Sequence, residues 1–318
     1  MDGRDFFERA RAGGRTLVLD GGLATELERR GFDLKDPLWS AKILVERPDA
    51  IRRVHLDYLE AGAECITTAS YQATFDGLRA RGFDRAAAER LLRDSVALAQ
   101  EAREEFASGR PEEAERVRIA ASIGPYGAYL ADGSEFRGDY GLSRDALMEF
   151  HARRFEVLAS SGADVLACET IPCLIEAEAL ARLIERARGV WAWVSFSCRD
   201  GARTRLGEPI EEGAALLEQV EGVAAVGVNC TAPEHVEELI ARIRSATRKP
   251  IVVYPNSGQT WDAAGRRWIG RADVASFLSA ARPWRLAGAT AIGGCCMTGP
   301  EHVRGLAKMA AGAADEGG

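Results

Sequence analysis

The sequence lacks any apolar run that approaches the roughly 20 residues needed to cross a bilayer, and it contains no long basic run. Its first residues, MDGRDFFERARAGG, mix acids and bases and lack the hydrophobic segment of a signal peptide. The net charge is -7, which argues against nucleic acid or an anionic membrane surface as a partner. We therefore expect a cytoplasmic protein that acts on small molecules, and no motif indicates an obligatory protein partner.

The chain also lacks CxxC pairs, from which closed four-cysteine zinc sites are usually built. Its four histidines all fall in helical patterns, where a surface or capping role is expected before metal ligation. Seven cysteines is an odd number in a chain much longer than the small secreted domains that depend on disulfides, so we expect reduced thiols. Four of them are expected to be small buried hydrophobic residues, namely Cys65, Cys168, Cys173 and Cys198.

Eight short apolar runs alternate with longer amphipathic stretches along the chain. Strands that are apolar on both faces and separated by helices pair in parallel, with right-handed crossovers. Eight such units predict a single-domain (β/α)8 TIM barrel over residues 1–310, followed by a disordered tail at 311–318. A doubly wound open sheet is the alternative, because one miscounted strand would prevent closure. The eight runs are residues 16–22, 65–70, 117–125, 164–170, 190–198, 224–230, 250–256 and 288–296.

The longest connections follow the runs at 16–22, 117–125 and 250–256, so we expect extended βα loops at the carboxyl ends of the strands. Barrel enzymes build their active sites at that end. Polar and thiol side chains that end the predicted strands should therefore converge on one mouth of the barrel. These side chains include Asp20, Thr67, Glu169, Asn229, Cys230, Cys295 and Cys296.

Three of these side chains are thiols, and three thiolates around one point suit Zn²⁺, which prefers four tetrahedral ligands. A fourth position would stay open, as in catalytic zinc sites. Cys295 and Cys296 are adjacent, however, and adjacent side chains of a strand point to opposite faces. Because two glycines precede them, we expect the backbone to turn there and to aim both thiols at one ion, with Cys230 across the mouth. A strained vicinal disulfide is the alternative.

Asp20 and Glu169 are the two acids predicted at the mouth. Each could have a structural role, since Asp20 in the sequence DGG can shape a turn and Glu169 can pair with an arginine. Together they could instead hold an ammonium group, while backbone amides between Gly21 and Thr25 could hold a carboxylate. That combination would recognise an amino acid.

The motifs DGGLATELERRG, CETIP, GVNC and GGCC resemble those of the homocysteine S-methyltransferase family, and the resemblance extends over about residues 16–310. It implies a zinc ion bound by Cys230, Cys295 and Cys296. It further implies that Asp20 and Glu169 contact the amino-acid end of homocysteine, with Thr67 and Asn229 in assisting positions.

The segments GPYGAYLADGSEFRGDY and YPNSG most resemble the branch of the family that uses S-methylmethionine, and often S-adenosylmethionine, as methyl donor. The betaine-dependent enzymes have a tyrosine directly after the matching glutamate, where this chain has Thr170, which weakens a betaine-type assignment. Aromatic faces favour cations such as a sulfonium, so Tyr126 and Tyr129, with Ser122, are candidates for the donor side.

The predicted reaction is direct transfer of a methyl group from a sulfonium donor to the thiolate of homocysteine, which forms methionine. Three alternatives remain open from the sequence: a betaine-type homocysteine methyltransferase, a zinc hydrolase on the same barrel, and a thiol sensor or metal-binding module without enzymatic activity. A zinc hydrolase usually draws on histidine and aspartate ligands, and no histidine is predicted at a strand end.

Overall fold

Eight parallel strands form a closed ring in the computed structural model, which describes residues 3–34, 40–258, 260–262, 267–269 and 273–315. The last strand pairs with both the first and the seventh, and a bridge between Leu19 and Cys65 joins the first strand to the second. The predicted TIM barrel is therefore confirmed, and the open sheet is not. The strands of the ring are β1 Leu17–Val18, β2 Cys65–Thr67, β3 Arg118–Ile123, β4 Val165–Ile171, β5 Ala192–Phe196, β6 Val223–Asn229, β7 Ile251–Tyr254 and β10 Ala291–Ile292.

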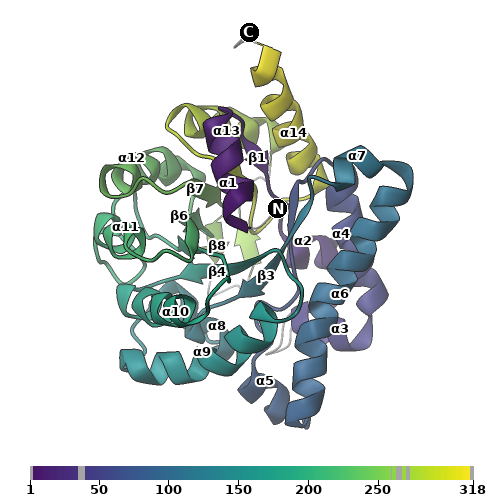
Figure 1. The fold of residues 1–318 in the computed structure, drawn as a ribbon, viewed down its shortest axis with the longest axis vertical. Coiled ribbons are helices and arrows are strands. Elements are labelled where there is room, and N and C mark those ends of the chain that lie inside the picture. The colour runs from purple at the N-terminus through teal and green to yellow at the C-terminus, as the bar shows by residue number, and fades with distance from the viewer. Residues whose placement is uncertain (1–2, 35–39, 259, 263–266, 270–272, 316–318) are drawn as a thin grey trace.

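Helices follow the strands in chain order and surround the ring (Figure 1). We expected disorder over 311–318, but the last helix continues to Asp315, and 316–318 lie outside the described residues. The helices that follow the strands are α2 Leu23–Arg29, α3 Ser40–Glu46, α4 Pro48–Glu60, α5 Phe75–Ala80, α6 Arg85–Gly109, α7 Pro111–Ala114, α8 Tyr126–Leu130, η1 Ser134–Phe136, α9 Arg144–Ala159, α10 Leu174–Arg186, α11 Ile210–Glu218, η2 Pro233–His235, α12 Val236–Ala246, α13 Val274–Leu286 and α14 Pro300–Asp315.

The strands bury apolar side chains on both faces, as the continuous apolar runs predict. On β4, Leu166 and Cys168 belong to the large cluster shared with the helices, whereas Val165 and Ala167 belong to a smaller cluster inside the ring. The alternation therefore assigns odd-numbered positions of β4 to the barrel interior as far as Glu169.

The interior cluster also includes side chains of an N-terminal helix, α1 Gly3–Ala12, that precedes the first strand. Phe7 of α1 is fully buried, and its ring meets Trp193 of β5 edge to face at 5.9 Å between centroids. This helix was not predicted, because it precedes the first of the repeating βα units. It adds apolar contacts to the barrel interior.

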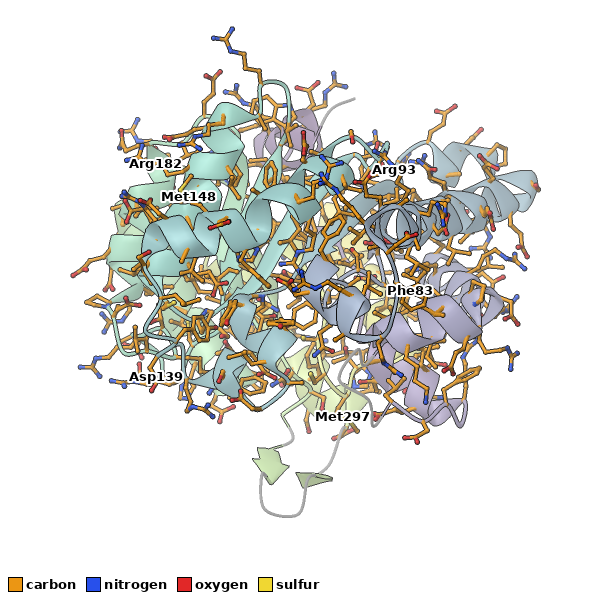
Figure 2. The ribbon with its side chains drawn as sticks, turned by 90° about the horizontal axis from the view of Figure 1, so that it is seen from below. Phe83, Arg93, Asp139, Met148, Arg182 and Met297 are labelled. Carbon is orange, nitrogen blue, oxygen red and sulfur yellow. The ribbon has the colours of Figure 1, made fainter. Side chains whose placement is uncertain are left out.

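The connection after β7 contains an antiparallel hairpin, β8 Thr260–Asp262 and β9 Arg267–Ile269. Figure 2 shows this hairpin projecting from the end of the molecule at which Met297 lies. The sequence predicts a long loop here and gives no indication of the two short strands. None of the described helices is both long and apolar enough to span a membrane.

Candidate metal centre

Three cysteines from two strand ends meet at one point of the barrel mouth. The Sγ atom of Cys230 lies 2.7 Å from that of Cys295 and 3.8 Å from that of Cys296. Cys230 follows β6 directly, whereas Cys295 and Cys296 follow β10 after two glycines. Among the described residues, these thiols form the one group of three close metal-ligating side chains.

The donor set fits a zinc ion. Thiolates at about 2.3 Å from a tetrahedral zinc ion lie roughly 3.8 Å from one another, and the Cys230–Cys296 pair already has this separation. The Cys230–Cys295 pair is closer, so one of these two sulfurs would move outward by about 1 Å on binding. The three cysteines could supply three of the four ligands, which would leave one position open.

The backbone departs from extended geometry after β10, as predicted. The Cys295 carbonyl accepts hydrogen bonds from the backbone N–H and the hydroxyl of Thr298, and Met297 between them has a positive φ of 63°. The expected reason was wrong, however, because neither Gly293 nor Gly294 has a positive φ. A Cβ atom at Gly293 would lie 2.6 Å from the Cβ atom of Leu19. Gly293 therefore leaves room for the segment that follows β1.

The loop after β7 holds the two adjacent cysteines through the backbone. Cys295 N–H donates to the Pro255 carbonyl, Cys296 N–H donates to Asn256 Oδ1, and Ser257 N–H donates to the Cys296 carbonyl. The YPNS segment therefore fixes the orientation of both thiols.

The other four cysteines lie in the apolar core. Burial raises the pKa of Cys168 and of Cys198 to about 12, and it raises the pKa of Cys65 and Cys173 as well. All four are almost fully buried. This agrees with the expectation that they act as small hydrophobic residues.

Asp20 lies at the same end of the barrel, two residues after the end of β1. Its carboxylate accepts hydrogen bonds from the backbone N–H of Thr67 at 2.7 Å and from the Thr67 hydroxyl at 3.0 Å. Burial raises the pKa of Asp20 to about 8, and the hydrogen bonds from Thr67 oppose this rise. Thr67 was predicted to assist the substrate, and in the structure its polar groups hold Asp20.

Glu169 points into the barrel near the end of β4. Its carboxylate accepts hydrogen bonds from the hydroxyls of Ser122 and Tyr254, which lower its pKa, but burial outweighs them and raises the pKa to about 7. Negative charge on Glu169 also contributes to the raised pKa of Asp20, so the two acids are close enough to interact. Within the described part of the chain, neither carboxylate forms a salt bridge with an arginine or a lysine; their partners are the hydroxyl and N–H groups named above. The pair therefore has the chemistry to accept a cation.

The predicted donor-side residues lie in two different places. Ser122 is fully buried and donates its hydroxyl hydrogen bond to Glu169. Tyr126 and Tyr129 belong to an aromatic cluster with Tyr140 and Phe150, in which Tyr126 meets Phe150 edge to face at 4.9 Å between centroids. The structure thus gives Ser122 a role beside Glu169, and it gives the tyrosines packing contacts with α9.

The backbone N–H group of Gly22 already has hydrogen-bond partners within the protein. The Gly22 N–H donates to the carbonyl and the hydroxyl of Thr298, so this amide is not free for a substrate carboxylate. A Cβ atom at Gly22 would lie 2.6 Å from the Cys295 carbonyl oxygen. Gly22 therefore allows the loop after β1 to pack against the cysteine turn.

Sequence reasoning missed Ser195 and Tyr254, which line the barrel interior beneath the mouth. The two hydroxyls lie 2.6 Å apart, and Tyr254 also accepts a hydrogen bond from Trp193 Nε1 at 2.9 Å. The strand alternation of WAWVSFSC and IVVYPN is a usable signal, since it places these side chains on the inner face.

A sequence model of the homocysteine S-methyltransferase family matches residues 17–310. This chain is a member of that family. Homocysteine S-methyltransferase YbgG of Bacillus subtilis is 51% identical to it over 296 residues, covering 92% of this chain and 94% of that protein. Homocysteine S-methyltransferase 4 of Zea mays is 50% identical over 308 residues, covering 94% and 90%. The homocysteine methyltransferase MmuM from Escherichia coli, solved in a metallated form, is similar with a TM-score of 0.84 and 46% identity, covering 93% of this chain and 96% of that one.

Membership of the homocysteine S-methyltransferase family confirms the resemblance seen in the motifs. The matched span includes every predicted site residue, from Asp20 to Cys296. In this chain the motifs contact one another: YPNS holds the GGCC turn, and DGG packs against it.

Proposed function

We propose that this homocysteine S-methyltransferase family member is a zinc-dependent enzyme that transfers a methyl group from a sulfonium donor to homocysteine, forming methionine. Family membership supports homocysteine methyl transfer, and the cluster of Cys230, Cys295 and Cys296 beside two buried acids supports the zinc dependence and the substrate. When bound, zinc would lower the pKa of the homocysteine thiol and keep it as the thiolate, which is the nucleophilic form.

Asp20 and Glu169 recognise the ammonium group of homocysteine in this proposal. Both carboxylates are buried. Burial raises the pKa of Asp20 to about 8 and that of Glu169 to about 7, as expected of buried carboxylates without a cationic partner. Thr67 and Ser122 orient them through the hydrogen bonds described above. The ammonium group would neutralise the pair and fix the amino-acid end of the substrate.

The chain contributes to methyl transfer chiefly by positioning. With zinc bound, the three thiolates would carry more negative charge than the ion neutralises, and the two carboxylates would add to it when ionised, which favours a cationic sulfonium over a neutral donor. Holding nucleophile and methyl group in line can supply much of the rate enhancement, so no covalent methyl-enzyme is required. The methyl group moves from the donor sulfur to the homocysteine sulfur, and the donor leaves as a neutral thioether.

S-methylmethionine is the proposed donor, with S-adenosylmethionine as a second one. Thr170 occupies the position where the resemblance implies a tyrosine in betaine enzymes, and its N–H and hydroxyl are engaged by Asn229.

A hydrolase is less well supported, because the one group of close metal ligands in the described residues is all cysteine. His151 pairs with Glu176, and His302 accepts a hydrogen bond from Gly299 N–H.

The test is methionine formation from homocysteine with S-methylmethionine, S-adenosylmethionine and betaine in parallel, using protein of measured zinc content. Activity with the two sulfonium donors and none with betaine is expected. Activity with betaine alone would refute the donor assignment, and zinc-loaded protein that is inactive with all three donors would refute the substrate. Because reduced thiols are required, we place the enzyme in a reducing compartment, in agreement with the predicted cytoplasmic location.

A further inference from the structure

The pairing of strand β4 with β5 changes register between Cys168 and Ile171. Cys168 pairs with Val194, but the next pair joins Ile171 to Phe196, so β4 has one residue more than β5 over this interval. Ile171 packs in the outer cluster, which period-two alternation from Ala167 would not allow without an inserted residue. This is a β-bulge, a feature often found beside active sites, where it directs a side chain.

Thr170 occupies the bulge with a φ of 63°. This left-handed conformation is unfavourable for a β-branched residue, and a residue held in it needs support from its surroundings. Thr170 directly follows Glu169, so its N–H belongs to the peptide group that joins the two residues. The conformation at Thr170 is therefore linked to the backbone that carries the Glu169 side chain.

The side-chain amide of Asn229 contacts Thr170 at two points. Asn229 Oδ1 accepts a hydrogen bond from Thr170 N–H at 2.7 Å, and Asn229 Nδ2 donates to Thr170 Oγ1 at 2.7 Å. Asn229 is itself fully buried, and Ser195 Oγ donates to its Oδ1 atom at 2.8 Å. These contacts fix the Asn229 amide between β6 and β5, and they hold the bulge of β4 from the second strand along the sheet.

We propose that Asn229 is a positioning residue: its amide keeps Thr170 in the left-handed conformation and so orients Glu169 toward the ammonium group of homocysteine. The inference rests on the proposed function for the identity of that cation. It makes the assisting role that the resemblance implies for Asn229 an indirect one, because Thr170 and Ser195 already engage the amide.

The experiment compares glycine with alanine at position 170. Glycine adopts a positive φ without strain, whereas alanine does not, and both substitutions remove the hydroxyl group. The variants are Asn229→Ala, Thr170→Gly, Asn229→Ala/Thr170→Gly and Asn229→Ala/Thr170→Ala, all compared with the unaltered enzyme. For each, we would measure KM for homocysteine, KM for S-methylmethionine, kcat, zinc affinity by chelator competition, and Tm.

Asn229→Ala is expected to raise KM for homocysteine by about tenfold or more, while KM for S-methylmethionine changes by less than about threefold. Adding Thr170→Gly should restore most of the homocysteine affinity, and adding Thr170→Ala should not. Zinc affinity should be the same in all variants within about threefold, because the three cysteines are unchanged. A general loss of structure would instead alter both KM values and would not distinguish glycine from alanine.

Equal recovery by glycine and alanine, or recovery by neither, would overturn the proposal, as would a loss of zinc affinity that Thr170→Gly fails to restore. If Asn229→Ala does not fold, it will be insoluble. In that case, soluble Asn229→Ala/Thr170→Gly together with insoluble Asn229→Ala/Thr170→Ala would support the proposal, and the reverse result would refute it. If the unaltered enzyme does not methylate homocysteine, the proposed function fails. The Tm comparison of the two double variants would then still test the support of Thr170 by Asn229.

Discussion

Replacing Glu169 by glutamine should stabilise the substrate-free enzyme at alkaline pH while impairing its use of homocysteine. Glutamine has nearly the same shape and can still accept the hydrogen bond from Ser122, so the change mainly removes a charge. Burial raises the pKa of Glu169 from 4.5 to about 7, which means that the folded protein holds its proton more tightly than the unfolded chain does.

The sign and the size of the effect follow from this difference. As pH rises from 4.5 to 7, the unfolded chain releases the proton before the folded protein does, so the free energy of unfolding falls with rising pH. The shift of about 2.5 pH units corresponds to about 3 kcal/mol at pH well above 7 and to almost nothing below pH 4.5. Glu169→Gln does not titrate, so it should gain about this amount over the unaltered enzyme at pH 8.5.

The assay is thermal or urea unfolding of both proteins at about pH 5 and pH 8.5, without substrate and with equal zinc content. A gain of about 3 kcal/mol would appear as an increase in Tm of about 5 °C at the higher pH and much less at the lower one. Glu149→Gln, which changes an exposed carboxylate on α9, is a matched control and should show no pH-dependent gain. The same Glu169→Gln enzyme should need at least tenfold more homocysteine for half-maximal rate, because one partner of the ammonium group has lost its charge.

The reasoning would be refuted if Glu169→Gln were destabilised at pH 8.5, or if its effect on stability were the same at both pH values. Either result would mean that Glu169 is not a desolvated carboxylate in the substrate-free enzyme. An unchanged homocysteine KM would separately remove Glu169 from the substrate site.

The zinc content should fall and methyl transfer should be abolished in each of Cys230→Ala, Cys295→Ala and Cys296→Ala, whereas Cys198→Ala should keep the metal. If metal analysis finds one of the first three variants fully loaded with zinc, that cysteine is not a ligand. A chelator should abolish methyl transfer, and added zinc should restore it; activity that survives complete removal of the metal would argue against zinc dependence. KM for homocysteine should rise as pH falls from about 9 to 6, because Asp20 and Glu169, with pKa values of about 8 and about 7, take up protons and lose the charge that attracts an ammonium group; a flat profile of KM against pH would count against this role. Thr67→Val keeps the backbone hydrogen bond to Asp20 but removes the hydroxyl one, so KM for homocysteine should rise about threefold to tenfold, and steady-state kinetics with no change would show that the hydroxyl is dispensable.

The alternation of apolar runs and amphipathic stretches was sufficient to predict the barrel, because each strand is buried on both faces and each helix on one. The α1 helix and the β8–β9 hairpin were not predicted. Both lie outside the repeating βα units, so the count of eight units carries no information about them. Phe6 and Phe7 gain their burial from side chains of distant strands, which a local pattern cannot show.

The convergence of the three cysteines could be predicted, because parallel strands in a closed barrel bring their carboxyl ends to one mouth. The bulge at Thr170 could not. Its inserted residue breaks the period of two on which strand prediction depends, and the amide that supports it lies 59 positions along the chain. The family resemblance implied an assisting position for Asn229 but not its partners, and in the structure its amide is engaged by β4 and β5.

The placement of the cysteines also affects when a metal can be retained during synthesis. Cys230 and Cys295 are separated by 65 positions, and β10, which carries Cys295 and Cys296 to the mouth, pairs with the first and the seventh strands at once. A nascent chain with seven strands therefore has a single thiol at the site. In the proposed zinc site, the full set of ligands would exist only after the last strand has been inserted, so zinc would not stabilise an incomplete barrel. A bound metal in this protein consequently reports that the ring has closed.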